Sequence, residues 1–153
     1  MLDWRWDFTW DILPRLLVAT GNTLLAAGLG YAIAMVLGLV LALAQRTPFT
    51  PLTVAVREAV EFVRSTPLVL QIFFVFYVGP QFGIRLSPWT AGMIAIGLHY
   101  AAYLSEVYRG GLESVPRGQW EAAKSLNLST ARTYFRIVLP QALSPSLAGM
   151  GNY

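Results

Sequence analysis

Few side chains in this sequence could do chemistry, and three of them lie inside long apolar stretches. Gln71, His99 and Tyr100 are polar or amphipathic groups surrounded by hydrophobic residues. If these stretches cross a membrane, polar atoms there need hydrogen-bond partners and often line the path of a solute. Each side chain could equally bind a neighbouring helix. The three residues are therefore candidates for a solute path, and the packing alternative stays open.

The sequence has few residues that could catalyse a reaction or bind a metal. It has no Cys, and His99 is its single His, so it can build neither a disulfide framework nor a zinc site. No Gly-Lys-Ser or Gly-Lys-Thr occurs, and the only lysine, Lys124, has the wrong context for a phosphate loop. Neither paired Asp residues nor a metal cluster lies in the apolar stretches. We therefore expect no enzyme activity, no metal and no cofactor bound by this chain.

One pair of charged residues stands at the end of an apolar stretch. Glu106 and Arg109 are three residues apart, which brings their side chains together on a helix. A gate is conceivable at such a place. A simple ion pair is the interpretation that we favour.

Three uncharged stretches must position these side chains. They run from Arg15 to Arg46, from Arg64 to Arg85 and from Arg85 to Glu106. Each has the roughly 20 residues that a helix needs to cross the hydrocarbon of a bilayer. The chain is 56% hydrophobic and 12% charged, and its apolar stretches lack the polar stripe that helices of soluble proteins normally keep. We predict an all-α membrane protein.

The pattern divides the chain into six segments. Alternating aromatic residues at Trp4, Trp6, Phe8 and Trp10 are typical of an interfacial anchor, and Pro67 predicts a kink in the second span. In chain order we expect an outer interfacial segment, three spans, a polar helical segment and the start of a fourth span, at residues 1–19, 20–44, 54–78, 88–108, 114–139 and 140–153.

Small residues recur at every fourth position along the first predicted span. This spacing places them on one helix face, where they allow another helix to approach closely. Small residues are also common in membrane helices generally, but the regular register favours a packing face. The residues are Ala26, Gly30, Ala34, Gly38 and Ala42.

The distribution of basic residues predicts an orientation. Eight Lys and Arg residues lie between the first two spans or after the third, against three on the other side. Since cytoplasmic loops carry the excess of positive charge, the N-terminus should face outward and the segment after Tyr108 the cytoplasm. This membrane orientation also explains the net charge of +3 better than nucleic-acid binding does, because no single basic patch is visible.

The polar segment 114–139 predicts two short helices joined by a tight break. Polar helix formers follow Pro116, and Ser129 is a plausible N-cap for a second helix. Between them Asn127 can take the left-handed conformation that closes a helix. Pro140 should end or kink the second helix.

The same segment resembles the EAA loop of ABC importer permeases. Glu121, Ala122 and Ala123 are followed at the family's spacing by Asn127 and then by Ile137–Pro140. The family pattern has Gly where this chain has Asn127, and the spacing is unchanged.

The wider chain is similar to the permeases for polar amino acids, such as those for histidine, glutamine, arginine or cystine. The likeness covers residues 17–153. The residues that carry it are Gly21, Asn22, Thr23, Leu24, Arg64, Ser65, Thr66, Pro67, Leu68, Gln71, Ala102, Tyr103, Glu106, Arg109, Gly110, Gly111, Gly118 and Gln119.

This resemblance implies a multi-pass subunit of the bacterial inner membrane that couples solute import to ATP hydrolysis on a separate ATPase subunit, which holds the ATP and Mg. A short coupling helix would dock on that ATPase. Further implied partners are a second permease, identical or related, an external solute-binding protein and the lipid bilayer, with no nucleic acid. The residues implied in coupling are Gly118, Glu121, Ala122, Ala123, Leu126 and Asn127.

A passive channel or membrane scaffold is the rival interpretation, and it gives no reason for a two-helix loop with this spacing. An intramembrane enzyme is a weaker rival.

Residues 140–153 resemble the family's entry into a further span. From that likeness we expect the 153 residues to be an incomplete transmembrane domain that inserts into membranes without supporting uptake.

Overall fold

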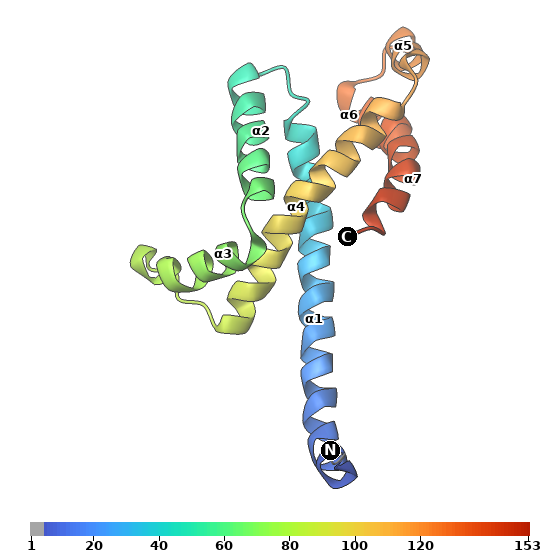
Figure 1. Cartoon of the computed structure of the whole chain (residues 1–153). Coiled ribbons are helices and arrows are strands. Elements are labelled where there is room, and N and C mark those ends of the chain that lie inside the picture. The colour runs from blue at the N-terminus through green and yellow to red at the C-terminus, as the bar shows by residue number, and fades with distance from the viewer. Residues whose placement is uncertain (1–4) are drawn as a thin grey trace.

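The computed structural model describes residues 5–153, and within that range every regular element is a helix. This agrees with the predicted all-α class. In chain order the elements are α1 (Trp6–Ala44), α2 (Thr50–Ser65), α3 (Leu68–Phe73), the π-helical η1 (Phe74–Val78), the 3-10 helix η2 (Gly79–Phe82), α4 (Pro88–Ser114), α5 (Arg117–Ser125), α6 (Thr130–Thr133), the π-helical η3 (Tyr134–Val138) and α7 (Leu139–Met150). Helix α4 lies at the centre, against α1, α2, α3 and α7 (Figure 1).

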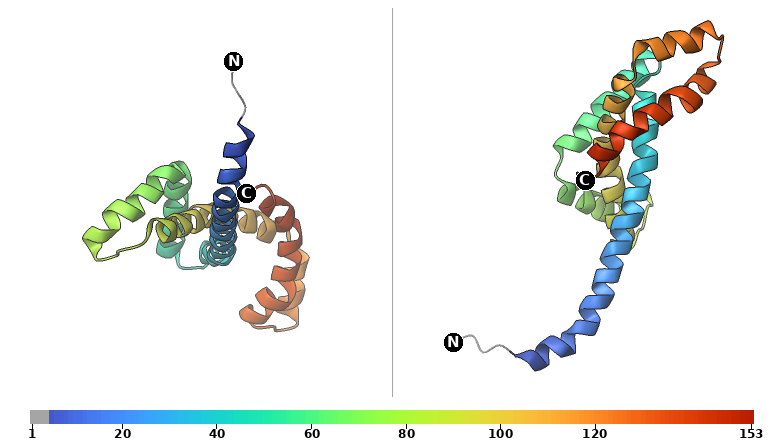
Figure 2. Two further views of the ribbon diagram at one scale, coloured as in Figure 1. Left: turned by 90° about the horizontal axis from the view of Figure 1, so that it is seen from below. Right: turned by 90° about the vertical axis from the view of Figure 1, so that its right-hand side faces the viewer.

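Helix α1 begins much earlier than the sequence pattern predicts. Residues 1–19 were expected to precede the first span as an interfacial segment, but one helix of 39 residues runs from Trp6 to Ala44. Pro14 lies inside it and the apolar residues that follow continue the helix, so the alternating aromatic residues do not form a separate element. Trp4 lies outside the described residues. The N-terminal half of α1 projects away from the other helices (Figure 2).

The crossing of α1 and α4 is built from small residues. Gly30, Ala34, Gly38 and Ala42 are buried on α1, and Ala26 is half-buried. A Cβ added at Gly38 would lie 3.0 Å from both the carbonyl oxygen of Ala101 and the Cβ of Leu104 on α4. The backbones therefore approach so closely that a larger side chain has no room, as expected for a stripe of small residues.

Helix α7 folds back onto α4 in the same manner. At Gly111 a Cβ would lie 2.5 Å from the carbonyl oxygen of Ala142 and would collide with Ser146 Oγ. At the end of α7, the hydroxyl of Tyr31 on α1 donates to the carbonyl of Met150 over 3.0 Å. These contacts fix the last described helix against both long helices.

The second predicted span is not one helix. Helix α2 and the segment Leu68–Phe82 are bent by 106° relative to each other, so the expected kink at Pro67 is a complete break. Thr66 is extended, with φ −100° and ψ 131°, because a residue before proline is pushed out of the helical region. Residues 54–78 therefore form two arms, α2 along α4 and α3 pointing away from it (Figure 1).

Pro140 neither ends nor breaks the helix in which it lies. The π-helical turn η3 directly precedes α7, and Pro140 occupies the first turn of α7. A π turn is one of the local changes by which a helix accommodates an interruption of its hydrogen bonds. The chain from Thr130 to Met150 thus continues as α6, η3 and α7 without a gap.

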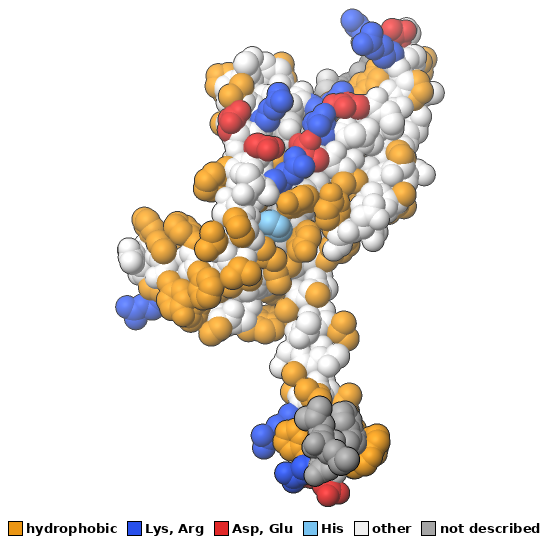
Figure 3. Space-filling view, in the orientation of Figure 1, with side chains coloured by type: hydrophobic (Ala, Val, Ile, Leu, Met, Phe, Trp, Pro, Cys, Tyr) orange, Lys and Arg blue, Asp and Glu red, His pale blue; other side chains and the backbone are white. Residues whose placement is uncertain are grey.

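By length and apolar composition, α1 is the one helix among residues 5–153 that could cross a membrane unbroken, and the bent pair around Pro67 passes the same test jointly. Apolar side chains cover α3 and the middle of the molecule, whereas charged side chains gather over α2, the adjoining part of α4 and α5 (Figure 3). The orientation and the number of spans remain predictions.

Candidate functional site

Helix α5 is held at the end of the molecule between two chain breaks. Pro116 precedes it in an extended conformation, and Asn127 follows it with φ 51°. The amide of Asn127 donates to the Lys124 carbonyl over 2.9 Å, and the amide of Leu128 donates to the Ala123 carbonyl over 3.1 Å. These two bonds make a Schellman motif. Asn127 thus closes the helix in the left-handed conformation that the sequence predicts.

The second helix of the segment also begins where its sequence indicates. Ser129 is the N-cap of α6, and its side chain accepts a hydrogen bond from the Arg132 amide over 3.5 Å. Its carbonyl accepts from the Thr133 hydroxyl over 3.2 Å. The predicted order of helix, tight break and helix is confirmed.

The outer face of α5 consists of small side chains with one acidic and one large apolar residue. Gly118, Glu121, Ala122 and Leu126 are exposed and share one side of the helix, since positions three, four and eight apart fall together. Leu126 is 72% exposed. We refer to these four residues as the outer face.

Ala123 does not belong to this face. It is only 1% exposed, so it packs within the chain and cannot give a partner the close approach that its small side chain suggested. Trp120 also points inward and packs against the hydrophobic core. Its ring meets the ring of Tyr134 edge to face at a centroid distance of 5.2 Å, and the guanidinium of Arg46 lies 5.5 Å from its centre.

The predicted solute-path residues do not form one site. Gln71 lies at the break after α2, and its Nε2 donates to the carbonyls of Val63 over 2.8 Å and Thr66 over 3.0 Å. Tyr103 donates its hydroxyl to the Arg64 carbonyl over 3.1 Å. These bonds add side-chain donors to carbonyls at the end of α2, where the Val63 carbonyl also accepts from the Thr66 amide over 3.3 Å. In this structure Gln71 makes the contacts expected of the packing alternative, and its place in a solute path stays a prediction.

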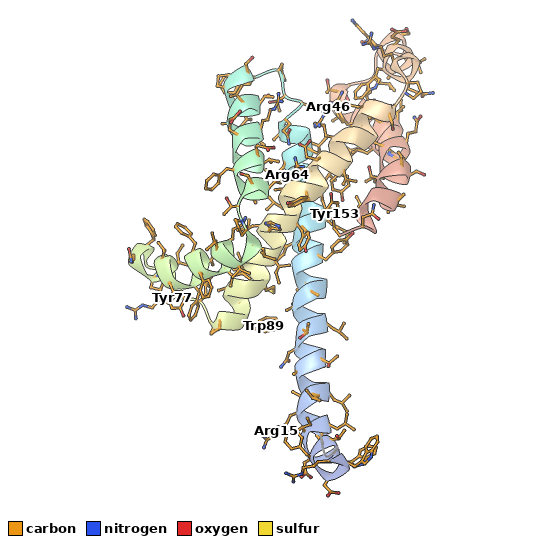
Figure 4. All side chains as sticks on the ribbon, in the orientation of Figure 1. Arg15, Arg46, Arg64, Tyr77, Trp89 and Tyr153 are labelled. Atoms are coloured by element: carbon orange, nitrogen blue, oxygen red, sulfur yellow. The ribbon has the colours of Figure 1, made fainter. Side chains whose placement is uncertain are left out.

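His99 and Tyr100 lie in an aromatic cluster on α4. Their rings are 5.4 Å apart, and Tyr103 and Tyr153 extend the cluster at 5.1 Å from His99 and 6.3 Å from Tyr100, respectively. Tyr153 lies beside the crossing of α1 and α4 (Figure 4). His99 Nδ1 is buried and has no hydrogen-bond partner among residues 5–153.

A cavity of about 330 Å³ lies between α2 and α4 and another of about 570 Å³ lies beside the aromatic cluster. The larger one is lined by Tyr100, Tyr153 and Tyr31 together with apolar residues of α1, α3 and α4. An aromatic cavity of this size at helix crossings suits a small molecule.

The cavity between α2 and α4 is lined by charged side chains. Arg109 binds Glu106 over 2.6 Å and Glu113 over 2.8 Å, so the predicted ion pair is present and extends to a second carboxylate. On the α2 side, Arg64 pairs with Glu61 of the same helix over 3.6 Å. The guanidinium of Arg64 lies 5.2 Å from the centre of the Tyr103 ring on α4. Arg64 projects from the end of α2 toward α4 (Figure 4).

Sequence reasoning did not identify two of these contacts. Tyr103 could have been found, because it follows His99 and Tyr100 at helical spacing. The stack of Arg46, Trp120 and Tyr134 could not, because its members are far apart in the chain. No group of His, Asp or Glu in residues 5–153 is arranged to hold a metal.

Both a family match and individual relatives relate this chain to transport permeases. Residues 34–153 match the family described as the binding-protein-dependent transport system inner membrane component. A probable amino-acid ABC transporter permease of Sinorhizobium fredii is 45% identical, with 97% of this chain and 69% of that protein aligned. The L-cystine transport system permease of Bacillus subtilis is 38% identical over 81% of this chain and 53% of its own length.

A solved structure of an amino acid ABC transporter is also similar to this chain. The crystal structure of an amino acid ABC transporter with histidines superposes with a TM-score of 0.73 at 30% identity, covering 90% of this chain and 68% of the other. The chain thus spans between about half and about two thirds of the length of these proteins.

Proposed function

The chain belongs to the family of binding-protein-dependent transport system inner membrane components, and from that premise we propose that it carries polar amino acids across the membrane with energy from a separate ATPase subunit. The observation that carries this proposal is the geometry of α5. A short helix closed by Pro116 and Asn127 presents an exposed outer face while its opposite side packs into the core.

The outer face fits a protein groove better than it fits water or lipid. Leu126 is 72% exposed although it is apolar, and Gly118 and Ala122 leave space for close approach of another backbone. Glu121 adds one charge that can orient the contact. Exposed apolar side chains with a polar rim are typical of interaction sites, and we assign this face to the ATPase subunit. No catalytic group for ATP hydrolysis is required of this chain.

The proposed solutes are polar amino acids, because relatives are named as permeases for L-cystine and nopaline and as a probable permease for glutamine. A structural neighbour was solved with histidines. The aromatic cavity lined by Tyr31, Tyr100 and Tyr153 is the proposed part of the solute path, with His99 beside it. Gln71 stays a candidate at the break after α2. A second permease and an external solute-binding protein complete the proposed assembly.

The experiment for this function uses the full-length protein, reconstituted in proteoliposomes with its ABC-type ATPase and a solute-binding protein. Uptake of labelled histidine, glutamine, arginine and cystine is measured with and without ATP. We expect ATP-dependent uptake of at least one of them, lost when Leu126→Asp and Glu121→Lys are combined. The control Lys124→Gln, which lies nearly opposite Leu126 around the helix, should retain uptake. ATP-independent flux through the wild-type protein would instead favour the passive channel.

The proposed orientation has its own test. Because the chain has no Cys, single cysteines at Gln81 and Ser125 report the two sides of the membrane without background. A membrane-impermeant thiol reagent added to intact cells should label Gln81→Cys and spare Ser125→Cys until the membrane is opened. The reverse pattern would invert the orientation.

A further inference from the structure

We propose that Trp120 is the positioning residue through which α5 moves the membrane helix α1. This inference rests on the proposed function, since it takes α5 as the helix that meets the ATPase. It concerns the inner side of α5, opposite the outer face.

Helix α5 touches the rest of the chain through few side chains. Trp120 is its one aromatic residue, and it packs on the core and on Tyr134. Ala123 is buried but small. Gln141 donates a long hydrogen bond of 3.4 Å to Gln119, across which little displacement is carried. Apart from the short chain links to α4 and α6, the Trp120 ring is therefore the largest contact through which a displacement of α5 can reach other helices.

The Trp120 ring contacts Arg46 at the end of α1. Arg46 lies two residues beyond the end of α1, and its amide donates to the Leu43 carbonyl over 3.1 Å. The Arg46 backbone is thus part of the last turn of α1, and its guanidinium lies over Trp120 at 5.5 Å. Attraction between a guanidinium and an indole face holds the two groups together. Figure 4 shows Arg46 at the end of α1 nearest to α5.

The other side of the ring leads to α7. Tyr134 begins η3, which continues directly into α7, and α7 packs closely on α4 at Gly111. Trp120 therefore lies where three elements meet: α5, the end of α1, and the η3–α7 helix.

An apolar groove separates the end of α1 from η3 beside this contact. The groove has a volume of about 390 Å³. Its walls are the end of α1 with Arg46, Thr47 and Pro48 on one side, and Tyr134 and Phe135 on the other. Since packed contacts and not open space transmit displacement, the stack of Arg46, Trp120 and Tyr134 links the two sides at this end of α1, whereas the bond of Tyr31 to Met150 links α1 to the far end of α7.

The test compares Trp120→Leu, Trp120→Phe and Arg46→Gln in the full-length transporter. Three quantities are measured: co-purification of the ATPase, its basal rate of hydrolysis, and the stimulation of that rate by the amino-acid-loaded solute-binding protein. We expect Trp120→Leu to co-purify with the ATPase but to lower the stimulation ratio about tenfold, within the range of allosteric coupling. Trp120→Phe, which keeps a ring, should restore most of the ratio, and Arg46→Gln should lower it partly.

Trp10→Leu is the matched control, because it removes a tryptophan that is 64% exposed at the other end of α1. It should leave the ratio unchanged. The proposal is overturned if Trp120→Leu keeps the wild-type ratio. It is equally overturned if that variant loses the ATPase altogether, since Trp120 would then serve docking or folding. A wild-type chain that never binds an ATPase would instead reject the proposed function.

Discussion

Helix α4 meets α1 and α2 through two very different interfaces. Against α1 it offers alanine and glycine, and the backbones come so close that a Cβ at Gly38 would lie 3.0 Å from a carbonyl oxygen. Against α2 it offers Glu106, Arg109 and Glu113 around a cavity of about 330 Å³. Close-packed small residues leave no room for rearrangement. Among the described residues each ion pair lies within α2 or within α4, so no ion pair ties these two helices together, and the chain breaks after α2. The comparison indicates a rigid pair, α1 with α4, and an adjustable arm, α2 with α3.

The largest effect should come from enlarging the close interface. Gly38→Leu must drive α1 away from Ala101 and Leu104, so we expect a loss of about 3 kcal/mol of stability, at the upper end for overpacked sites. Gly21→Leu is the control on the same helix, because nothing lies within 4 Å of a Cβ there. Thermal unfolding in detergent measures both. Equal melting temperatures for the two variants would show that the α1–α4 contact is not close-packed.

An intermediate effect is expected at the break between the two arms. Gln71→Leu leaves the carbonyls of Val63 and Thr66 without their side-chain donor, at a cost of about 1–2 kcal/mol. Gln81→Leu is the same substitution at an exposed position of η2 and should be nearly neutral. Combining Gln71→Leu with Tyr103→Phe, which removes the bond to the Arg64 carbonyl, should cost more than either alone. A neutral Gln71→Leu would contradict the assigned role at the break.

The smallest effect should come from the ion pairs. Arg109 is 40% exposed, and pairs accessible to solvent contribute about 1 kcal/mol or less. Arg109→Gln should therefore destabilise the chain slightly, and added salt should reduce the difference from wild type. Arg57→Gln, which has no ion-pair partner among the described residues, is the control. Because Arg109, Glu106 and Glu113 all lie on α4, a loss as large as that of Gly38→Leu would mean that these ion pairs are not weakened by solvent as expected.

The sequence predicts local features well and the relation between distant segments poorly. The break at Asn127, the cap at Ser129 and the pairing of Glu106 with Arg109 follow from rules that act over a few residues. The 106° bend at Pro67 exceeds the predicted kink, because a proline removes one helical bond but surrounding contacts decide the angle. Gln71 and Tyr103 fix that angle, and their partners on α2 are not visible from spacing.

The sequence also does not predict which residues form the outer face of α5. The motif contains both Ala122 and Ala123, yet only the fold decides that Ala122 is exposed and Ala123 is buried. The early start of α1 likewise could not be predicted, because alternating aromatic residues fit an interfacial segment as well as a helix. Helix periodicity identifies a face, but contacts far along the chain decide which way it points.

Cysteine labelling tests most directly whether the outer face of α5 binds the ATPase subunit. Leu126→Cys and Lys124→Cys each place one thiol on α5, and the labelling rate by a small maleimide is compared with and without bound ATPase. If the outer face docks on the ATPase, bound ATPase protects Leu126→Cys and leaves Lys124→Cys accessible. Unchanged labelling of Leu126→Cys in a complex that demonstrably contains the ATPase would contradict this docking.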